Sequence, residues 1–547
     1  MHQGIRIFLL AVISGLLCGT AGAQSLWRVD FRDKANHPLS LERPEEFLSE
    51  RALQRRAAQN IPLDESDLPV HPAYVDTLTS LGAIPVNASR WMNSLTVYLP
   101  ADSLATTIAS QGFVAAVECT RPATPAAKSA RNKFGIPGEP LPIDTSRYGA
   151  SVYQVGQLNG QALHTRGYTG KGVMVAILDA GFYMVNTLPA FDSLRLGGRI
   201  AGTRDMVWPP SDVYQEHTHG MMVLSTMGGL KPGALIGTAP HASYWLIRTE
   251  DTRSEFPVEE DNWIAGAELA DSAGCDIINS SLGYSTYDLP ELSHSFADLD
   301  GRTTRVARGA NMAAAKGLLV FSSAGNEGNK AWKKIQTPAD GDSVIAVAAV
   351  DRYGVKTSFS SVGPSADAEV KPTLAAMGQN NALEGINGQL TYASGTSFSS
   401  PVLAGMAACL WQARPDAPAY LIKEALIRSA HQFLSPDSLL GFGIPDMQTA
   451  LDLLITSISA PAAPGKKWSL YPIPFRDALT FFHSGEDPGE THIELFSITG
   501  QRLFHTPLHD RGPHRIAGLG HIPAGPHVVR ISGKHGTETH LITGGMP

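Results

Sequence analysis

Short apolar runs alternating with helix-length segments fill the middle of the 547-residue chain. Strands that are buried on both faces have nearly continuous apolar sequences, because helices cover both sides of a parallel sheet. The pattern therefore predicts an α/β domain over residues 149–455, with a central, mostly parallel sheet flanked by helices. The expected strands lie at 173–178, 244–247, 276–280, 318–322 and 344–350.

A different pattern precedes this domain. Apolar and polar residues alternate over 91–99, a second strand-like run covers 113–118, and the segment 102–110 between them has helical spacing. With an apolar helical turn at 75–81, these elements predict a small α+β domain of split βαβ type over residues 24–122. Residues 123–148 are rich in Pro, Gly, Ser and charge without periodicity, which indicates a linker and a plausible cleavage region.

The chain ends in a third pattern. Residues 456–466 form a linker rich in Pro and Ala, and residues 467–547 contain strand-like runs at 491–496 and 527–531. We expect an all-β sandwich there.

The first 23 residues have the features of a signal peptide. Arg6 is followed by an apolar stretch over 7–18 and by the small residues Ala21, Gly22 and Ala23, which predict cleavage before Gln24. An anchor helix is the alternative, but the apolar stretch is short for a bilayer span. We expect the protein to be exported, and to be extracellular or attached to the cell surface.

Composition and charge narrow the function classes. The formal net charge is −8, with 43% hydrophobic and 17% charged residues, and the chain has no long Lys/Arg runs. Neither nucleic acid nor an anionic membrane is an indicated partner. The four cysteines are too few and too scattered for a disulfide framework or a zinc site. We expect core thiols, and one Cys275–Cys409 bridge stays open.

Three segments could carry chemistry. Asp179 follows a β-branched run, His219 opens a helix-like stretch, and Ser397 precedes a helical run with Pro401 in its first turn. Alone, each has an ordinary alternative: a capping aspartate, a metal-binding pair with His217, or an N-cap serine. Together they supply a nucleophile, a base and a group that orients the base.

The three segments GKGVMVAILDAGF, EHTHGMMVLSTMGG and ASGTSFSSPVLAGMAACLW, in the order Asp…His…Ser, resemble the catalytic blocks of the subtilisin-like serine proteases. The resemblance covers residues 150–455 and implies a subtilisin-like fold. It also implies a secreted serine endopeptidase that acts on proteins or peptides, with Asp179, His219 and Ser397 as the catalytic triad.

Further blocks imply the rest of the site. FSSAGNEG resembles the segment whose Asn donates to the oxyanion hole, which assigns Asn326 together with the Ser397 amide. INSSLGY resembles the strand that pairs with an extended substrate. The implied substrate-binding residues are Ser281, Leu282, Gly283, Ala324 and Gly325. The chemistry needs no cofactor and we assign no metal ligand, although calcium is frequent in this family and stays open.

Several positions depart from the family pattern, and two of them lie next to the predicted triad residues. Ala180 stands where a Ser or Thr could bond to the catalytic aspartate, and Phe398 replaces a common Met after the nucleophile. In addition, the acidic stretch with Glu259, Glu260 and Asp261 either lines the S4 subsite or is a solvated face.

Position in the chain and resemblance to known domains indicate what the two flanking domains do. A domain at 24–122, between export signal and protease, resembles an inhibitory propeptide, with autoprocessing expected between Arg121 and Tyr148. LYPIPFRDALTF, IELFSITGQRL and IPAGPHVVRISG resemble the sorting domains of type IX secretion substrates, which implies outer-membrane secretion machinery as a partner. A carbohydrate- or partner-binding β domain is the alternative.

Two rival functions keep the fold. One is a catalytically inactive surface scaffold or adhesion protein, and the other is an esterase or peptide ligase that uses the same acyl-enzyme. The complete triad with Asn326 favours the endopeptidase, which we expect to be a monomer.

Overall fold

The computed structural model describes residues 25–123, 134–141, 147–209, 211–458, 468–471, 479–483, 489–508, 514–523, 525–534 and 536–544. The predicted signal peptide and residues 459–466 of the predicted second linker lie outside these residues. Within the described part of the chain, no helix combines the length and the apolar character that a membrane span requires.

A seven-stranded parallel sheet forms the centre of the molecule, as predicted. Two of its strands were not predicted, because β7 is an edge strand of mixed polarity and β14 has only four residues. The strand order across the sheet is β14 (Leu374–Met377), β13 (Ile345–Val350), β12 (Leu319–Ser323), β11 (Ile277–Ser280), β6 (Met174–Asp179), β10 (Ser243–Arg248) and β7 (Ile200–Asp205).

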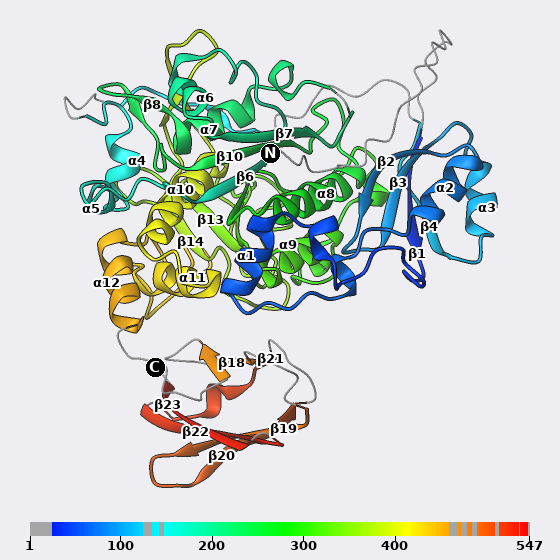
Figure 1. Ribbon diagram of the computed structural model, residues 1–547. Coiled ribbons are helices and arrows are strands. Elements are labelled where there is room, and N and C mark those ends of the chain that lie inside the picture. Colours follow the sequence, from blue (N-terminus) through cyan, green and yellow to red (C-terminus); the bar gives the residue numbers. More distant parts are fainter. Residues whose placement is uncertain are drawn as a thin grey trace, which may run out of the picture.

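Helices cover both faces of this sheet (Figure 1). Along β6, Val175 and Ile177 point into one core, whereas Ala176 and Leu178 point into the other, because successive strand residues face opposite sides. The second core belongs to α8 (Val258–Ala273) and α9 (Arg305–Ala315). The first belongs to α7 (His219–Gly228), α10 (Thr396–Ala413), α11 (Ala419–Arg428) and α12 (Met447–Ile458).

Shorter elements complete the central domain. They are α4 (Val152–Gly156), α5 (Gln161–His164), α6 (Asp192–Leu196), β5 (Ile136–Pro137), β8 (Leu230–Lys231), β9 (Leu235–Ile236), β15 (Asn381–Glu384) and β16 (Leu390–Ser394).

The N-terminal domain is an antiparallel four-stranded sheet with helices α2 (Pro72–Ser80) and α3 (Leu104–Ala109). Its strand order is β2 (Ile84–Ser89), β3 (Ser94–Leu99), β1 (Ser25–Phe31) and β4 (Val114–Arg121). The predicted α-β-α-β order was incomplete. It omitted β1, and it omitted β2, whose pairing is irregular between Pro85 and Asn87.

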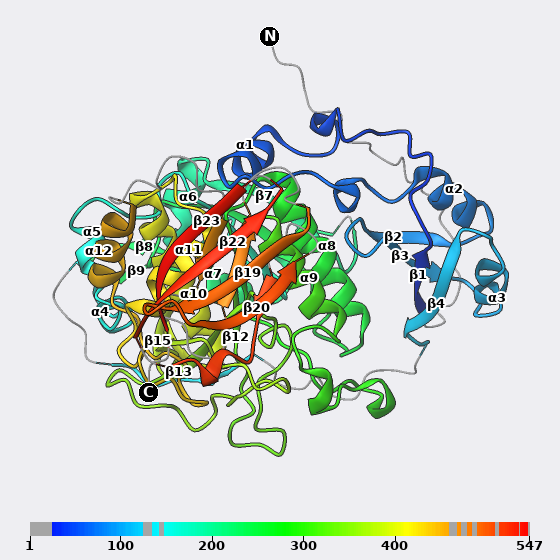
Figure 2. The same ribbon diagram turned by 90° about the horizontal axis from the view of Figure 1, so that it is seen from below.

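Between β1 and α2 the chain makes a long excursion that contains α1 (Glu50–Ala58) and the 3-10 helix η2 (Glu65–Asp67). Helix α1 lies apart from α2 and α3, against the central domain (Figures 1 and 2). Sequence periodicity did not reveal α1, because its buried residues are Ala52, Arg55 and Arg56 rather than a stripe of large apolar side chains.

Helix α8 is the main contact surface for the N-terminal sheet. The Glu268 carboxylate accepts hydrogen bonds from Ser89 Oγ at 2.6 Å and from the backbone N–H of Arg90 at 2.8 Å. Nearer the start of the helix, Asn87 Nδ2 donates to Asn262 Oδ1 at 2.8 Å. This interface is therefore built from matched polar groups.

The C-terminal domain consists of two antiparallel sheets that share one apolar core, which includes Phe481, Ile493 and Val529. One sheet holds β17 (Trp468–Tyr471), β18 (Leu479–His483) and β21 (His514–Ile516). The other holds β20 (Arg502–Leu508), β19 (Thr491–Ser497), β22 (Gly525–Gly533) and β23 (Gly536–Gly544). Strands β19 and β22 include the two predicted runs.

The acidic residues at the start of α8 are buried, so of the two alternatives the solvated face is wrong. Glu260 Oε1 accepts a 2.7 Å hydrogen bond from His294 Nε2, and its Oε2 accepts the backbone N–H of Val306 at 3.0 Å. Asp261 pairs with Arg28 of the N-terminal domain at 2.6 Å. Their position at a helix N-terminus also places negative charge where the helix dipole favours it.

The Glu260–His294 pair gives the fold a defined pH dependence. Burial alone would raise the pKa of Glu260, but the hydrogen bond and charge of His294, together with Arg305, lower it from 4.5 to about 2. Burial opposes the charged form of His294 too, yet the Glu260 carboxylate raises its pKa. A depressed carboxylate pKa stabilises the folded state above the unfolded pKa, and that stability is lost as the pH falls through the folded pKa.

We therefore expect the protein to lose about 3 kcal/mol of stability from this site as the pH falls from about 4.5 to 2, as judged from the pKa shift. Glu260→Gln should flatten this part of the pH profile in thermal unfolding. The exposed Glu291→Gln is the matched control. Equal acid sensitivity of Glu260→Gln and the unmodified protein would contradict the assignment.

Candidate active site

Asp179 and His219 meet at the carboxyl end of the central sheet, where α/β proteins build their sites. Asp179 is the last residue of β6 and His219 the first of α7. Asp179 Oδ1 accepts a 2.7 Å hydrogen bond from His219 Nδ1 and another of 2.7 Å from the backbone N–H of Ala180. Both side chains are fully buried. The bond fixes the ring so that Nε2 is the nitrogen left for chemistry.

Two glycines allow this close approach. A Cβ built on Gly220 would lie 2.4 Å from the Gly181 carbonyl oxygen and 3.0 Å from Asp179 Cβ. Gly181 has a φ of +146°, and a Cβ there would lie 2.3 Å from the His217 nitrogen. The His-Gly and Asp-x-Gly pairs of the sequence are thus explained by the contact between β6 and α7.

Ser397 approaches from the N-terminus of α10. Its Oγ donates to the Ser281 carbonyl oxygen at 3.3 Å, and Ser281 Oγ donates back to the Ser397 carbonyl oxygen at 2.8 Å. Among the described residues, His219 Nε2 and Asp179 Oδ2 have no hydrogen-bond partner. The neighbouring Phe398 ring lies 5.9 Å from the His219 ring, centre to centre. The structure therefore places the Ser397 end of α10 beside the Asp179–His219 pair, and the serine hydroxyl is not bonded to the histidine.

Hydrogen bonds from Thr396 hold the Asn326 side chain near the N-terminus of α10. Its Oδ1 accepts the backbone N–H of Thr396 at 2.9 Å and Thr396 Oγ1 at 3.0 Å. Because the oxygen is used in this way, Nδ2 is the free end, and it lies 3.5 Å from where a Cβ on Gly395 would be. The Ser397 N–H lies in the first turn of α10, where helical partners are missing. These two donors can serve one oxyanion.

The predicted substrate-binding residues surround Ser397 from two strands. Ser281, Leu282 and Gly283 follow β11 directly, and Ser281 contacts Ser397 as described. Ala324 and Gly325 follow β12, where Ala324 is fully buried and the Gly325 N–H donates to Thr396 Oγ1 at 3.2 Å. A backbone segment suited to pairing with an extended chain thus runs beside the site.

A segment of the chain itself lies across the site, which sequence periodicity did not reveal. Strand β5 pairs antiparallel with β16, with Ile136 opposite Ser394. The Phe134 ring lies 4.6 Å from the His219 ring, centre to centre. Gly135 Cα lies 3.2 Å from the position of a Cβ built on Gly395. Residues 134–138 therefore occupy the space next to His219 and Gly395.

The structure answers whether Cys275 and Cys409 form a disulfide. Cys119, Cys275 and Cys409 are free thiols, so a Cys275–Cys409 bridge was not formed. Burial raises the pKa of the Cys275 and Cys409 thiols, which leaves them protonated and unreactive.

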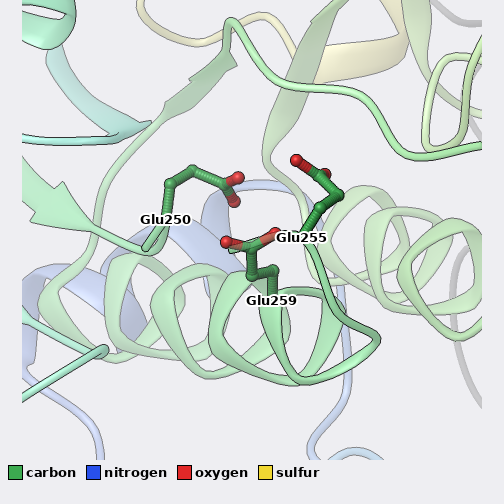
Figure 3. Close-up of side chains that lie close together, drawn as sticks. All are labelled: Glu250, Glu255 and Glu259. Carbon is green, nitrogen blue, oxygen red and sulfur yellow. The ribbon is translucent and has the colours of Figure 1, made fainter. Parts of the chain in front are cut away.

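Two groups of three carboxylates lie close enough to share an ion, but both are engaged by protein donors. In the group of Figure 3, the Tyr284 hydroxyl donates to Glu250 and the Asp251 N–H donates to Glu259 at 3.0 Å. Glu255 is its third member. In the second group, of Asp342, Asp367 and Glu369, Arg302 pairs with Asp342 at 3.0 Å. We assign a metal to neither group.

Comparison with known proteins agrees with this geometry. Residues 170–443 match the Subtilase family, and residues 26–134 match the peptidase S8 propeptide domain of Bacteroidota. The chain is 30% identical over 310 residues to subtilisin NAT of Bacillus subtilis subsp. natto, covering 55% of this chain and 72% of that protein. It is 28% identical over 304 residues to subtilisin of Bacillus pumilus, covering 54% and 98%.

Among solved structures, MycP1 from Mycobacterium smegmatis is similar with a TM-score of 0.45 and 22% identity, over 59% of this chain and 89% of that one. The family match spans the strands and helices that carry Asp179, His219 and Ser397. The chain belongs to the Subtilase family of serine-type endopeptidases.

Proposed function

We propose that this protein is an exported endopeptidase, made as an inactive precursor, that uses Asp179, His219 and Ser397 to hydrolyse peptide bonds in proteins. The observation that carries the proposal is the buried 2.7 Å bond between Asp179 and His219, directed at the helix end that holds Ser397.

In this mechanism His219 Nε2 takes the proton of Ser397 Oγ as the oxygen attacks the carbonyl carbon of the peptide bond. Asp179 holds the ring tautomer through Nδ1 and stabilises the imidazolium that forms. His219 then gives the proton to the leaving amine, and water hydrolyses the acyl-enzyme by the same steps in reverse order.

Asn326 Nδ2 and the Ser397 N–H would donate to the tetrahedral oxyanion. The anchoring of Asn326 Oδ1 by Thr396 supports this role, because a preorganised donor needs no reorientation during the reaction. Residues 281–283 would pair with the substrate backbone, which binds many sequences through main-chain hydrogen bonds.

The same side chains weigh against the rival functions. An inactive scaffold would not need the buried Asp179–His219 pair, whose uncompensated polar atoms carry a cost in stability. An esterase or ligase would use the same acyl-enzyme, but water is the acceptor available to an exported enzyme.

In this proposal the structure corresponds to the precursor, in which Ser397 Oγ bonds to the Ser281 carbonyl oxygen and not to His219. Residues 134–138 fill the space beside the catalytic side chains, and their removal would free it for substrate. The N-terminal domain would remain bound as an inhibitor through its contacts with α8.

We expect Ser397→Ala to abolish casein hydrolysis, because the variant lacks the hydroxyl that would attack the peptide bond and form the acyl-enzyme. Unmodified protein and variant should be secreted side by side, and their mature N-termini compared by mass spectrometry. Only the unmodified protein should be cut between its N-terminal domain and its protease domain. If both are inert and equally processed, the chain is a substrate of another protease and the endopeptidase proposal is wrong.

Processing should occur at the Phe134–Gly135 bond. Gly135 lies next to Gly395 and the Asn326 amide, and Ile136 pairs with Ser394, so within residues 134–141 this bond lies beside the proposed oxyanion donors. The match to the propeptide domain ends at the same residue, 134. We expect a mature N-terminus of Gly135 by mass spectrometry of the active enzyme. A mature chain that begins elsewhere between residues 121 and 148 would place the cut at a different bond.

For the C-terminal domain we propose a role in export, on the resemblance to type IX sorting domains. Its independent apolar core supports a separate folding unit. A reporter fused to residues 457–547 and given a signal peptide should reach the cell surface of a host with that secretion system. Retention of the fusion in the periplasm would favour a binding domain instead.

A further inference from the structure

The excursion between β1 and α2 makes contacts far from the catalytic residues. Its residues 49–67, here called the arm, contain α1 and η2. Arg51 Nε donates to the Gly274 carbonyl oxygen at 2.8 Å, and the Arg55 guanidinium donates to the Cys275 carbonyl oxygen. Arg55 also pairs with Asp271 in the last turn of α8. The arm therefore binds the C-terminal end of α8.

The arm binds the end of α9 in a similar way. Gln59 Nε2 donates to the Gly317 carbonyl oxygen at 2.8 Å, and Gln59 Oε1 accepts the backbone N–H of Ala419 at 3.0 Å. Lys316, which follows α9, forms ion pairs with two acidic residues of the arm. Its Nζ lies 3.1 Å from Asp64 and 3.0 Å from Asp67. The arm therefore contributes both cationic and anionic side chains to its contact with the central domain.

These contacts suit the electrostatics of helix ends. The last carbonyls of a helix lack helical partners and carry partial negative charge, so cationic donors are favourable there. The fit is also close. A Cβ built on Gly274 would lie 2.7 Å from Arg51 Cβ, and one on Gly317 would lie 2.7 Å from Ile61 Cδ1. The arm therefore recognises these two helix ends by charge and by shape.

Asp271 is the centre of the contact. Arg56 lies 2.8 Å from its Oδ2, and Arg55 and Arg90 bind the same carboxylate. All four side chains are at least 92% buried, with Asp271 fully so. Removing one partner of such a buried charge pair is costly, because the other charge is left uncompensated in a low dielectric.

The arm and the catalytic site lie at opposite ends of the sheet. Arg51 contacts Asp276, which immediately precedes β11 and accepts the N–H of Met174, the first residue of β6. Asp179 is at the other end of β6, about 17 Å away for a five-residue step along a strand. Cleavage beside Phe134 therefore leaves the arm contacts intact.

We propose that the arm is a second attachment of the N-terminal domain, which keeps that domain bound to the protease after the linker is cut and so prolongs its inhibition. This inference rests on the proposed function, in which the N-terminal domain is the inhibitor. The arm, with its arginines, binds the surface formed by Asp271, Gly274 and Gly317 of the same chain.

The test uses the full chain with Ser397→Ala, so that cleavage does not depend on its own activity. A recognition sequence for a specific protease replaces part of residues 124–133, and the cut complex is diluted while the dissociation of the N-terminal fragment is followed. Arg55→Gln with Arg56→Gln should speed dissociation at least about tenfold, because loss of buried charged contacts acts mainly on the dissociation rate. Arg43→Gln, on the same excursion but 58% exposed and paired only within it, is the matched control.

A dissociation rate of the double variant equal to that of Arg43→Gln would overturn the proposal. If the double variant does not fold, Gln59→Ala replaces it, since it removes two hydrogen bonds without stranding a charge. It should dissociate about threefold faster or more, and an unchanged rate would again contradict the proposal. Because the parent chain lacks the serine, this result is independent of whether the protein is an active endopeptidase.

Discussion

The hydrogen bond between Asp179 and His219 is the constraint on which the rest of the site depends. It joins the end of β6 to the start of α7, and it requires glycine at 181 and 220 for the two backbones to approach. Asp179 is buried and its Oδ2 lacks a partner among the described residues, so the position is costly unless the imidazole is held beside it. The other predicted site residues are placed relative to this pair by the parallel sheet, whose strands end at one edge.

Helix α8 links catalysis to folding and inhibition. Its first turn carries the buried acids that bind Arg28 and His294, its middle binds the N-terminal sheet through Glu268, and its last turn binds the arm through Asp271. Since α8 also packs on the face of β6 formed by Ala176 and Leu178, the N-terminal domain completes a surface of the same core that positions Asp179. The N-terminal domain and the central sheet therefore pack against the same helix, α8.

The sequence predicted the parts whose signal is local. Continuous apolar runs predicted five of the seven sheet strands, and short motifs around Asp179, His219 and Ser397 predicted residues that the structure brings together. What it could not predict depends on contacts between distant segments. Helix α1 buries arginines, so it has no apolar stripe that would predict a helix. The acids of α8 are buried through partners in other elements, which the local sequence does not identify. Strand β5 is two residues long and exists only because β16 lies beside it.

The most direct test of the account is covalent labelling of the processed enzyme with an alkyl fluorophosphonate, followed by mass spectrometry. Such a reagent phosphonylates a serine only where a neighbouring base activates it and donors hold the developing negative charge. The account predicts a single adduct on Ser397, formed rapidly in the processed protein. No adduct on the processed protein, or one on a different serine, would contradict the assignment of Ser397 as the nucleophile.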